Sequence, residues 1–174
     1  PDTEVLIAGP DIIRGNSKTG YLRGSGYANY LRRLIKKNKL NGRVSFIGRQ
    51  NTNEMCARYL ESNVFISASS TENESNSLGE AKMLGMPVIA SFVGGVSNRI
   101  KHREDGLAYQ YDDFVMLARF ICDIFDDPDL AIWYGSNARI NEFKISDKKK
   151  NVERLLQIYA CINHSNSLGE PETE

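Results

Sequence analysis

The sequence predicts an α/β domain of three layers, in which helices cover both faces of a parallel sheet and further helices follow at the C-terminal end. Three observations lead to this fold class. The chain has 174 residues, the size of one ordinary domain, so we expect a single core. Up to Tyr109, short apolar runs alternate with longer amphipathic stretches, which is typical of parallel strands joined by helices. After Asp113 no strand-like run follows.

The first part of the chain predicts two strands and two helices in alternation. The strands are expected at 4–8 and 43–47, and the helices at 21–37 and 53–61. Both strands are short apolar runs, ended by Gly9 and by Gly48. In the first helix the apolar residues recur three or four positions apart, as on one helix face. Thr52 is the expected N-cap of the second helix, because its hydroxyl can accept an amide hydrogen bond.

The middle of the chain predicts three more strands, separated by a helix and a helical turn. The strands are expected at 64–67, 86–91 and 106–109, and the helix at 77–84. Gly85 is expected to end that helix, because glycine readily adopts the left-handed conformation that follows many helices. Gly94 and Gly95 are expected to open the helical turn.

The C-terminal part predicts helices at 114–125, 130–143 and 150–163. Asp127 is the expected cap of the second, with Pro128 at the first helical position. In the last helix, four apolar residues at helical spacing are expected to face the core: Val152, Leu155, Leu156 and Tyr159. We assign 1–163 to the domain and the polar stretch 164–174 to a disordered tail.

The composition excludes several classes of function. Lys and Arg number 22 and Asp and Glu 22, so the net charge is zero and no nucleic-acid surface is expected. No apolar run approaches the ~18 residues of a membrane span, and the first residues do not form a signal peptide. Three widely spaced cysteines indicate reduced thiols in a cytoplasmic protein, and two histidines are too few for a Cys/His metal site.

The segment 67–91 carries the chemistry. A strand ends near Ser67, a loop rich in Ser, Asn and Glu follows, and a helix begins near Ser77. In open α/β sheets, ligands bind outside the carboxyl ends of the strands. A helix start there presents amides without helical partners and a partial positive charge, which together suit a phosphate group.

Two carboxylates flank this helix start. Glu72 lies in the loop and Glu80 in the helix, with seven residues between them. A carboxylate next to a phosphate is repelled by its negative charge, so each of the two would have to bind hydroxyl groups of the ligand. This arrangement suits a ligand with a diphosphate between two polyols. A nucleotide diphosphate sugar has this layout. The alternative stays open that Glu80 is an ordinary first-turn carboxylate and the loop an ordinary cap.

Six motifs occur in a fixed order along the chain. They are Ile-Ala-Gly-Pro (7–10), Val-Ser-Phe-Ile-Gly (44–48), Phe-Ile-Ser-Ala-Ser (65–69), Glu-x7-Glu-Ala (72–81), Gly-Met-Pro-Val-Ile-Ala (85–90) and Val-Gly-Gly-Val (93–96). With them, the stretch from Val5 to Tyr159 resembles the C-terminal domain of the retaining GT-B glycosyltransferases, the group 1 family. The resemblance implies a Rossmann-like three-layer domain that forms one half of a GT-B fold.

The resemblance also implies a role for each site residue. Glu80 would hold the donor ribose and Glu72 the transferred sugar, and these two are the candidate catalytic residues. The sugar and the diphosphate would be lined by Asn73, Ser75, Asn76, Ser77 and Leu78. Gly48 and Arg49 would approach the base, and Gly94 and Gly95 would let the backbone come near the donor. Neither a metal nor a further cofactor is expected.

The sequence departs from the family in three ways. Asn73-Glu74-Ser75 replaces the Gly-Phe-Gly or Asn-Phe-Pro of many relatives, which leaves the direction of Glu74 open. Asn98 stands where many relatives have a glutamate. The family's basic phosphate-binding pair and its acceptor-binding N-terminal domain precede the first strand of this chain. We therefore expect the chain to lack a first strand and helix and to be inactive alone.

As a whole, the resemblance implies an enzyme that moves a sugar from a nucleotide diphosphate sugar to a glycan or lipid-linked acceptor, in surface polysaccharide synthesis. Such an enzyme would work in the cytoplasm, at the inner face of the membrane. Two alternatives stay open. One is a nucleotide-sugar epimerase or isomerase of the same fold, and the other is a nucleotide-binding module without catalytic activity.

Overall fold

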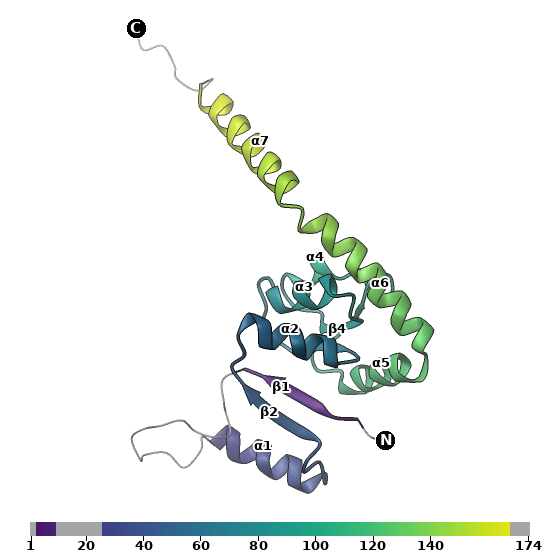
Figure 1. Ribbon diagram of the computed structural model, residues 1–174. Coiled ribbons are helices and arrows are strands. Elements are labelled where there is room, and N and C mark those ends of the chain that lie inside the picture. Colours follow the sequence, from purple (N-terminus) through teal and green to yellow (C-terminus); the bar gives the residue numbers. More distant parts are fainter. Residues whose placement is uncertain (1–2, 10–25, 168–174) are drawn as a thin grey trace. The chain divides into compact units, whose positions relative to one another are not determined.

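Strands and helices alternate along the computed structural model, which describes residues 3–9 and 26–167 (Figure 1). The elements are β1 (Val5–Ala8), α1 (Gly26–Lys37), β2 (Val44–Gly48), α2 (Thr52–Glu61), β3 (Phe65–Ser67), α3 (Asn76–Met83), β4 (Val88–Ser91), α4 (Val96–Arg99), β5 (Leu107–Tyr109), α5 (Phe114–Asp126), α6 (Pro128–Ile145) and α7 (Lys148–Ser167). Every predicted strand and helix has a counterpart. Positions 21–25 of the first predicted helix lie outside the described residues.

Contacts divide the chain into two compact units, Pro1–Arg58 and Tyr59–Glu174, where the length led us to expect one core. In the first unit, β1 and β2 pair in parallel, with Val5 opposite Val44. The prediction that Thr52 caps α2 is wrong. Asn51 is the cap: its Oδ1 accepts from the Glu54 amide at 3.0 Å, and Glu54 Oε2 accepts from the Asn51 amide at 2.8 Å. This reciprocal pair satisfies two amides at once, which a threonine one residue later cannot do.

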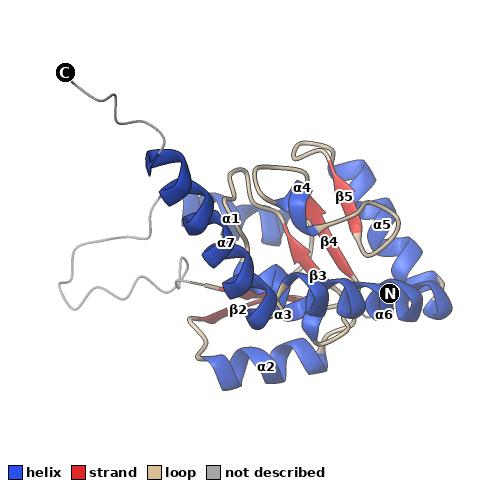
Figure 2. Cartoon of the chain, turned by 90° about the horizontal axis from the view of Figure 1, so that it is seen from above, coloured by secondary structure: helices blue, strands red, loops and turns tan. Residues whose placement is uncertain are grey.

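The second unit is built on a sheet of three parallel strands in the order β3-β4-β5 (Figure 2). All four residues of the central strand β4 are buried. The apolar core lies between this sheet and helices α5 and α6. Its buried members are Ile89, Leu107, Tyr109, Phe120, Ile124 and Tyr134. Because the strands are parallel, their carboxyl ends share one edge, and the loops toward α3, α4 and α5 leave from that edge.

The helix boundaries follow local capping rules. Asp127 caps α6 with Pro128 in its first turn, as predicted, and its side chain accepts from the Leu130 amide at 2.9 Å. Gly85 follows α3 with φ +78°, also as predicted. Helix α6 lies close to this turn. A Cβ added to Gly135 would lie only 2.1 Å from the carbonyl oxygen of Gly85, so glycine is needed where the two backbones meet. The contact brings α6 against α3, the helix that contains Glu80.

Helix α7 differs from its prediction in two ways. It continues to Ser167, past the expected domain end at residue 163, and 168–174 lie outside the described residues. The four residues expected to face the core are instead about half exposed or more: Val152 55%, Leu155 49%, Leu156 61% and Tyr159 58%. Helical spacing shows that a helix has an apolar side. It does not show that another element of the same chain packs over that side. In this chain, none of the described elements covers the apolar side of α7.

The predicted fold class, an α/β/α arrangement with parallel strands, is confirmed. Among the described helices, none is long and apolar enough to cross a membrane.

Candidate active site

The candidate site begins at the carboxyl edge of the second sheet, where residues 68–75 connect β3 to α3. The turn after β4 lies beside this loop. Ser91, the last residue of β4, donates a hydrogen bond from Oγ to the carbonyl oxygen of Ser69 at 2.6 Å. The strand that leads to Gly94 and Gly95 is thereby tied to the loop that carries Glu72.

Ser75 is the N-cap of α3. Its Oγ accepts from the Leu78 amide at 3.3 Å and lies 3.1 Å from Oγ of Ser77. The amide of Leu78 is therefore occupied within the chain, and its side chain is fully buried. The amides of Asn76 and Ser77 have no hydrogen-bond partner among the described residues. The helix start thus leaves two adjacent donors available, as an anion site requires.

Glu80 is fixed by a tyrosine that the sequence reading missed. Tyr59 Oη lies 3.1 Å from Glu80 Oε2 and 3.3 Å from the carbonyl oxygen of Ser77. The tyrosine is 4% exposed, and its ring packs edge-on against Phe65. Burial and the nearby carboxylate raise the pKa of Tyr59 well above its ordinary value, so its hydroxyl remains a donor at neutral pH. No sequence signal connects Tyr59 to Glu80, because the two lie in different helices.

Glu72 and Asn73 pack their backbone onto the glycine pair. The Gly95 amide donates to the carbonyl oxygen of Glu72 at 3.1 Å. A Cβ on Gly94 would lie 1.7 Å from that oxygen, and a Cβ on Gly95 would lie 1.7 Å from the carbonyl oxygen of Asn73. The glycines therefore make room for this loop. Their predicted approach to a donor stays a prediction.

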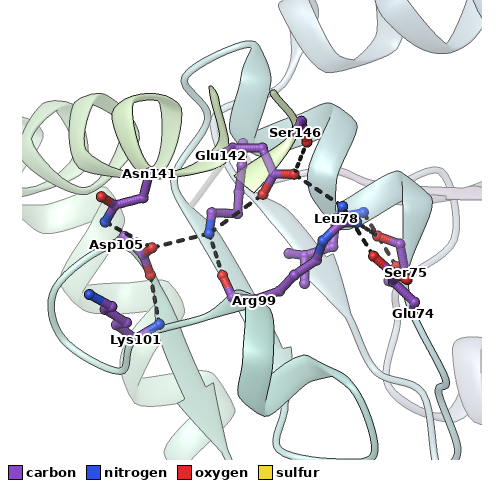
Figure 3. A network of polar contacts seen from close by, with 10 residues as sticks. Glu74, Ser75, Leu78, Arg99, Lys101, Asp105, Asn141, Glu142 and Ser146 are labelled. Atoms are coloured by element: carbon purple, nitrogen blue, oxygen red, sulfur yellow. Dashed lines mark hydrogen bonds and ion pairs between the residues drawn. The ribbon is translucent and has the colours of Figure 1, made fainter. Parts of the chain in front are cut away.

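Glu74, whose direction the sequence left open, turns toward Arg99 (Figure 3). Its Oε1 lies 3.5 Å from Arg99 Nη2, and its side chain is 71% exposed. The guanidinium also donates from Nη1 to the carbonyl oxygen of Ser75 at 2.6 Å. This third carboxylate near the helix start, beside Glu72 and Glu80, is therefore paired with a cation. Asn98, one residue before Arg99, is exposed.

Lys82 is a second residue that the sequence reading missed. It is fully buried, with Nζ 3.1 Å from Asp105 Oδ2 and 3.8 Å from Glu142 Oε2. A signal for its burial was present, since Leu78, Ala81 and Lys82 are spaced as one helix face and all three are buried. A lysine on such a face needs acidic partners from elsewhere in the fold, and the sequence does not name them.

Gly48 and Arg49 lie in the first unit, at the carboxyl end of β2. Gly48 has φ +75°, and Arg49 is exposed. Their predicted approach to a nucleotide base stays a prediction. Among the described residues, no group of three or more His, Cys, Asp or Glu side chains could hold a metal ion.

The family described as "Glycosyl transferases group 1" matches residues 1–141 of the chain. This chain belongs to that family. A curated relative of this group 1 glycosyltransferase chain is the N-acetyl-alpha-D-glucosaminyl L-malate synthase of Bacillus anthracis. The two are 28% identical over 138 residues, which is 79% of this chain and 35% of the relative.

Solved structures show the same fold. HepE of Anabaena, solved in complex with UDP and glucose, superposes with a TM-score of 0.73 at 20% identity. The match covers 90% of this chain and 41% of HepE. A C-terminal domain of a group 1 family protein, LpcC of Francisella tularensis, superposes with a TM-score of 0.63 at 21% identity. That match covers 70% of this chain and 63% of the LpcC domain.

These findings confirm the resemblance to the C-terminal domain of a GT-B glycosyltransferase. This chain spans about a third of the length of its curated relative and under half of HepE.

Proposed function

We propose that this chain is the donor-binding part of a retaining glycosyltransferase, which moves a sugar from a nucleotide diphosphate sugar to an acceptor hydroxyl. The observation that carries the proposal is the start of α3. There the amides of Asn76 and Ser77 have no partner among the described residues, between two carboxylates at positions 72 and 80. Membership of the group 1 family and the UDP-bound HepE structure support it.

The two amides would bind the diphosphate. As the bond between the sugar C1 and the phosphate oxygen breaks, negative charge grows on the leaving diphosphate. Fixed N–H donors and the positive end of a helix stabilise that charge without having to reorient. The acceptor oxygen then forms its bond to C1 on the same face, and its proton passes to the leaving phosphate. This route needs no nucleophile from the protein.

Glu80 would hold the ribose. Tyr59 binds Oε2, and no described residue binds Oε1, so one carboxylate oxygen is available to accept from a ribose hydroxyl. Glu72 would hold the hydroxyls of the transferred sugar from the other side of the diphosphate. Since amides and a helix end compensate the phosphate charge in this arrangement, we propose that transfer proceeds without a divalent metal, and that EDTA leaves turnover unchanged.

The acceptor would be a glycan or a lipid-linked glycan, bound by an N-terminal domain. This chain matches only 35% of the length of the curated relative, which supports a second domain in the longer enzyme. An acceptor carried on a lipid would bring that enzyme to the inner face of the membrane.

The proposal is tested by NMR titration of the 174-residue chain with UDP, ADP and GDP. We expect weak binding in the millimolar range, with the largest amide shifts at Asn76 and Ser77. Uridine, which lacks the diphosphate, should leave both amides unmoved. Shifts that fall elsewhere for all three nucleotides would reject the site.

A pair of variants at position 76 separates the backbone from the side chain. Proline suits the first helical position, and Ser75 before it is already extended, with φ −83° and ψ 105°. Asn76→Pro therefore removes one amide while α3 keeps its start, and it should weaken UDP binding. Asn76→Ala, which keeps the amide, should change the affinity much less. Equal effects of the two would contradict the proposed role of the amide.

A further inference from the structure

A buried network of charged side chains adjoins the start of α3. Lys82 of α3 and Glu142 of α6 are 0% exposed, and Asp105, before β5, is 1% exposed. Arg99, at the end of α4, contributes a second cation, with Nη2 3.1 Å from Glu142 Oε1. Two cations and two buried carboxylates therefore balance in charge. Lys82 Nζ also donates to the carbonyl oxygen of Arg99, which connects the two cationic residues.

Arg99 joins this network to the loop before α3 (Figure 3). Its guanidinium donates to the Ser75 carbonyl oxygen at 2.6 Å and lies 3.5 Å from the Glu74 carboxylate. The same carbonyl oxygen accepts from the Gly79 amide at 3.3 Å, which begins the hydrogen-bond ladder of α3. Arg99 thus holds the backbone that sets where the helix begins.

Gly79 leaves space for this contact. A Cβ at this position would lie 2.7 Å from Arg99 Nη1 and 3.0 Å from Glu142 Oε1. Any larger residue would push against the guanidinium or its partner. Arg99 therefore lies against α3 itself, within about one helical turn of the amides of Asn76 and Ser77.

Stability alone does not explain these charges. Apolar residues of similar volume often give equal or greater stability than a buried ionic network. Here Arg99 Nε and Glu142 Oε2 are buried without a hydrogen-bond partner among the described residues. Unlike an apolar contact, a guanidinium fixes the position of its partners, because its planar N–H groups donate hydrogen bonds in defined directions. In this chain the guanidinium donates to the carbonyl oxygen of the N-cap Ser75, and it is held on its other side by the buried carboxylate of Glu142.

We propose that Arg99, held by Glu142 and Lys82, is a positioning residue for the diphosphate-binding amides at the start of α3. The inference rests on the proposed function, because the amides of Asn76 and Ser77 are the groups that it directs. By anchoring Ser75, the guanidinium keeps the N-cap in place, so both amides point out of the helix end before the ligand arrives. Donors that are ordered in advance bind charge without reorganising.

The first test uses hydrogen exchange in the 174-residue chain without ligand. The amides of Leu78 and Gly79 bond to Ser75 and report on the order of the helix start. Arg99→Met should speed their exchange about 10-fold or more, as a local opening, while the Ile89 amide in β4 stays unchanged. Arg99→Lys, which keeps the charge, should restore part of the protection.

Arg119→Met is the matched control. Arg119 is 73% exposed and pairs with Asp123 at 2.8 Å on the surface of α5. Its loss should change neither the exchange of Leu78 and Gly79 nor UDP binding. The second test is the UDP titration, in which Arg99→Met should raise the dissociation constant about 10-fold and Arg99→Lys by less.

Each outcome decides the proposal. Unchanged exchange at Leu78 and Gly79 in the Arg99 variants would overturn it, and so would faster exchange that includes Ile89, which indicates a general structural role. If Arg99→Met does not fold, Arg99→Lys is judged by the same two criteria. If UDP does not bind even the unaltered chain while Leu78 and Gly79 respond, the proposed function fails and the ordering of the helix start by Arg99 stands.

Discussion

The hydroxyl of Tyr59 lies 3.1 Å from Oε2 of Glu80, and this contact places a buried, protonated phenol behind an exposed carboxylate. Burial and the carboxylate itself raise the pKa of Tyr59, so the hydroxyl keeps its proton at neutral pH. One oxygen of Glu80 is thereby held, and the other accepts no hydrogen bond from a described residue.

Tyr59→Phe should weaken UDP binding while the fold is kept. The substitution removes one hydrogen bond, which is worth ~0.5–1.5 kcal/mol, so the dissociation constant should rise about 2- to 12-fold. Tyr159→Phe, at a side chain that is 58% exposed, is the control and should have no effect. The NMR titration measures both. Equal affinities for Tyr59→Phe and the unaltered chain would remove Tyr59 from the site.

Glu80→Ala and Glu72→Ala should differ in the longer enzyme. We expect Glu80→Ala to raise the KM for the donor, because it removes a ribose contact. Glu72→Ala should mainly lower kcat, by about 100- to 1000-fold if it removes a contact that strengthens in the transition state. Glu153→Ala, exposed on α7, is the control for an unrelated carboxylate. Steady-state kinetics like those of the unaltered enzyme for both site variants would end the assignment.

Gly94→Ala and Gly95→Ala should each destabilise the second unit by about 2–4 kcal/mol. Each added Cβ would meet a backbone oxygen of the Glu72–Asn73 segment at 1.7 Å, and backbone cannot rotate away as a side chain can. Gly94 also has φ +48°, which disfavours alanine. Urea unfolding followed by circular dichroism measures the loss. At Gly26, where a Cβ would meet nothing within 4 Å, alanine should cost little.

Lys82→Met should lower the free energy of unfolding by about 3–5 kcal/mol, because it leaves the carboxylates of Asp105 and Glu142 without this cation in a buried site. Lys101→Met is the matched control. Lys101 is 70% exposed and lies 3.9 Å from Glu104, so its loss should cost less than about 1 kcal/mol. A small effect at position 82, equal to that at 101, would show that the buried network adds nothing to stability.

His102 should make stability depend on pH. Its Nδ1 accepts from the Ala108 amide at 3.0 Å, and burial together with Arg103 lowers its pKa below the ordinary 6.5. The folded chain therefore binds this proton less readily than the unfolded chain. Well above pH 6.5 both states are neutral, and stability falls as the pH drops through that value. His102→Asn, which does not titrate, should show a smaller fall in melting temperature between pH 7.5 and 5.5.

Local signals predicted most of the fold. Asp127 with Pro128 and the glycine at position 85 act within a few residues of their own helix ends, so the sequence alone revealed them. The cap of α2 was misjudged by one residue, because Asn51 and Thr52 are both good caps. Only the reciprocal contact between Asn51 and Glu54 separates them.

The contacts of the candidate site were less predictable. The spacing of Glu72 and Glu80 around a helix start is a pattern along the chain, and it was read directly. Tyr59 reaches Glu80 from 21 positions away, and Arg99 reaches Ser75 from 24 positions away. Both come from elements whose packing no local pattern describes.

By itself, the amino-acid order determined the alternation of strands and helices, the family motifs and the position of a helix start between two acids. Each of these depends on neighbours within a turn or a strand, whose preferences are set by covalent geometry and side-chain periodicity. Only the tertiary structure decided which side chain holds Glu80, where Glu74 turns, what the glycine pair makes room for and that the apolar side of α7 stays exposed. These depend on groups that are distant along the chain, and their meeting follows from how whole elements pack.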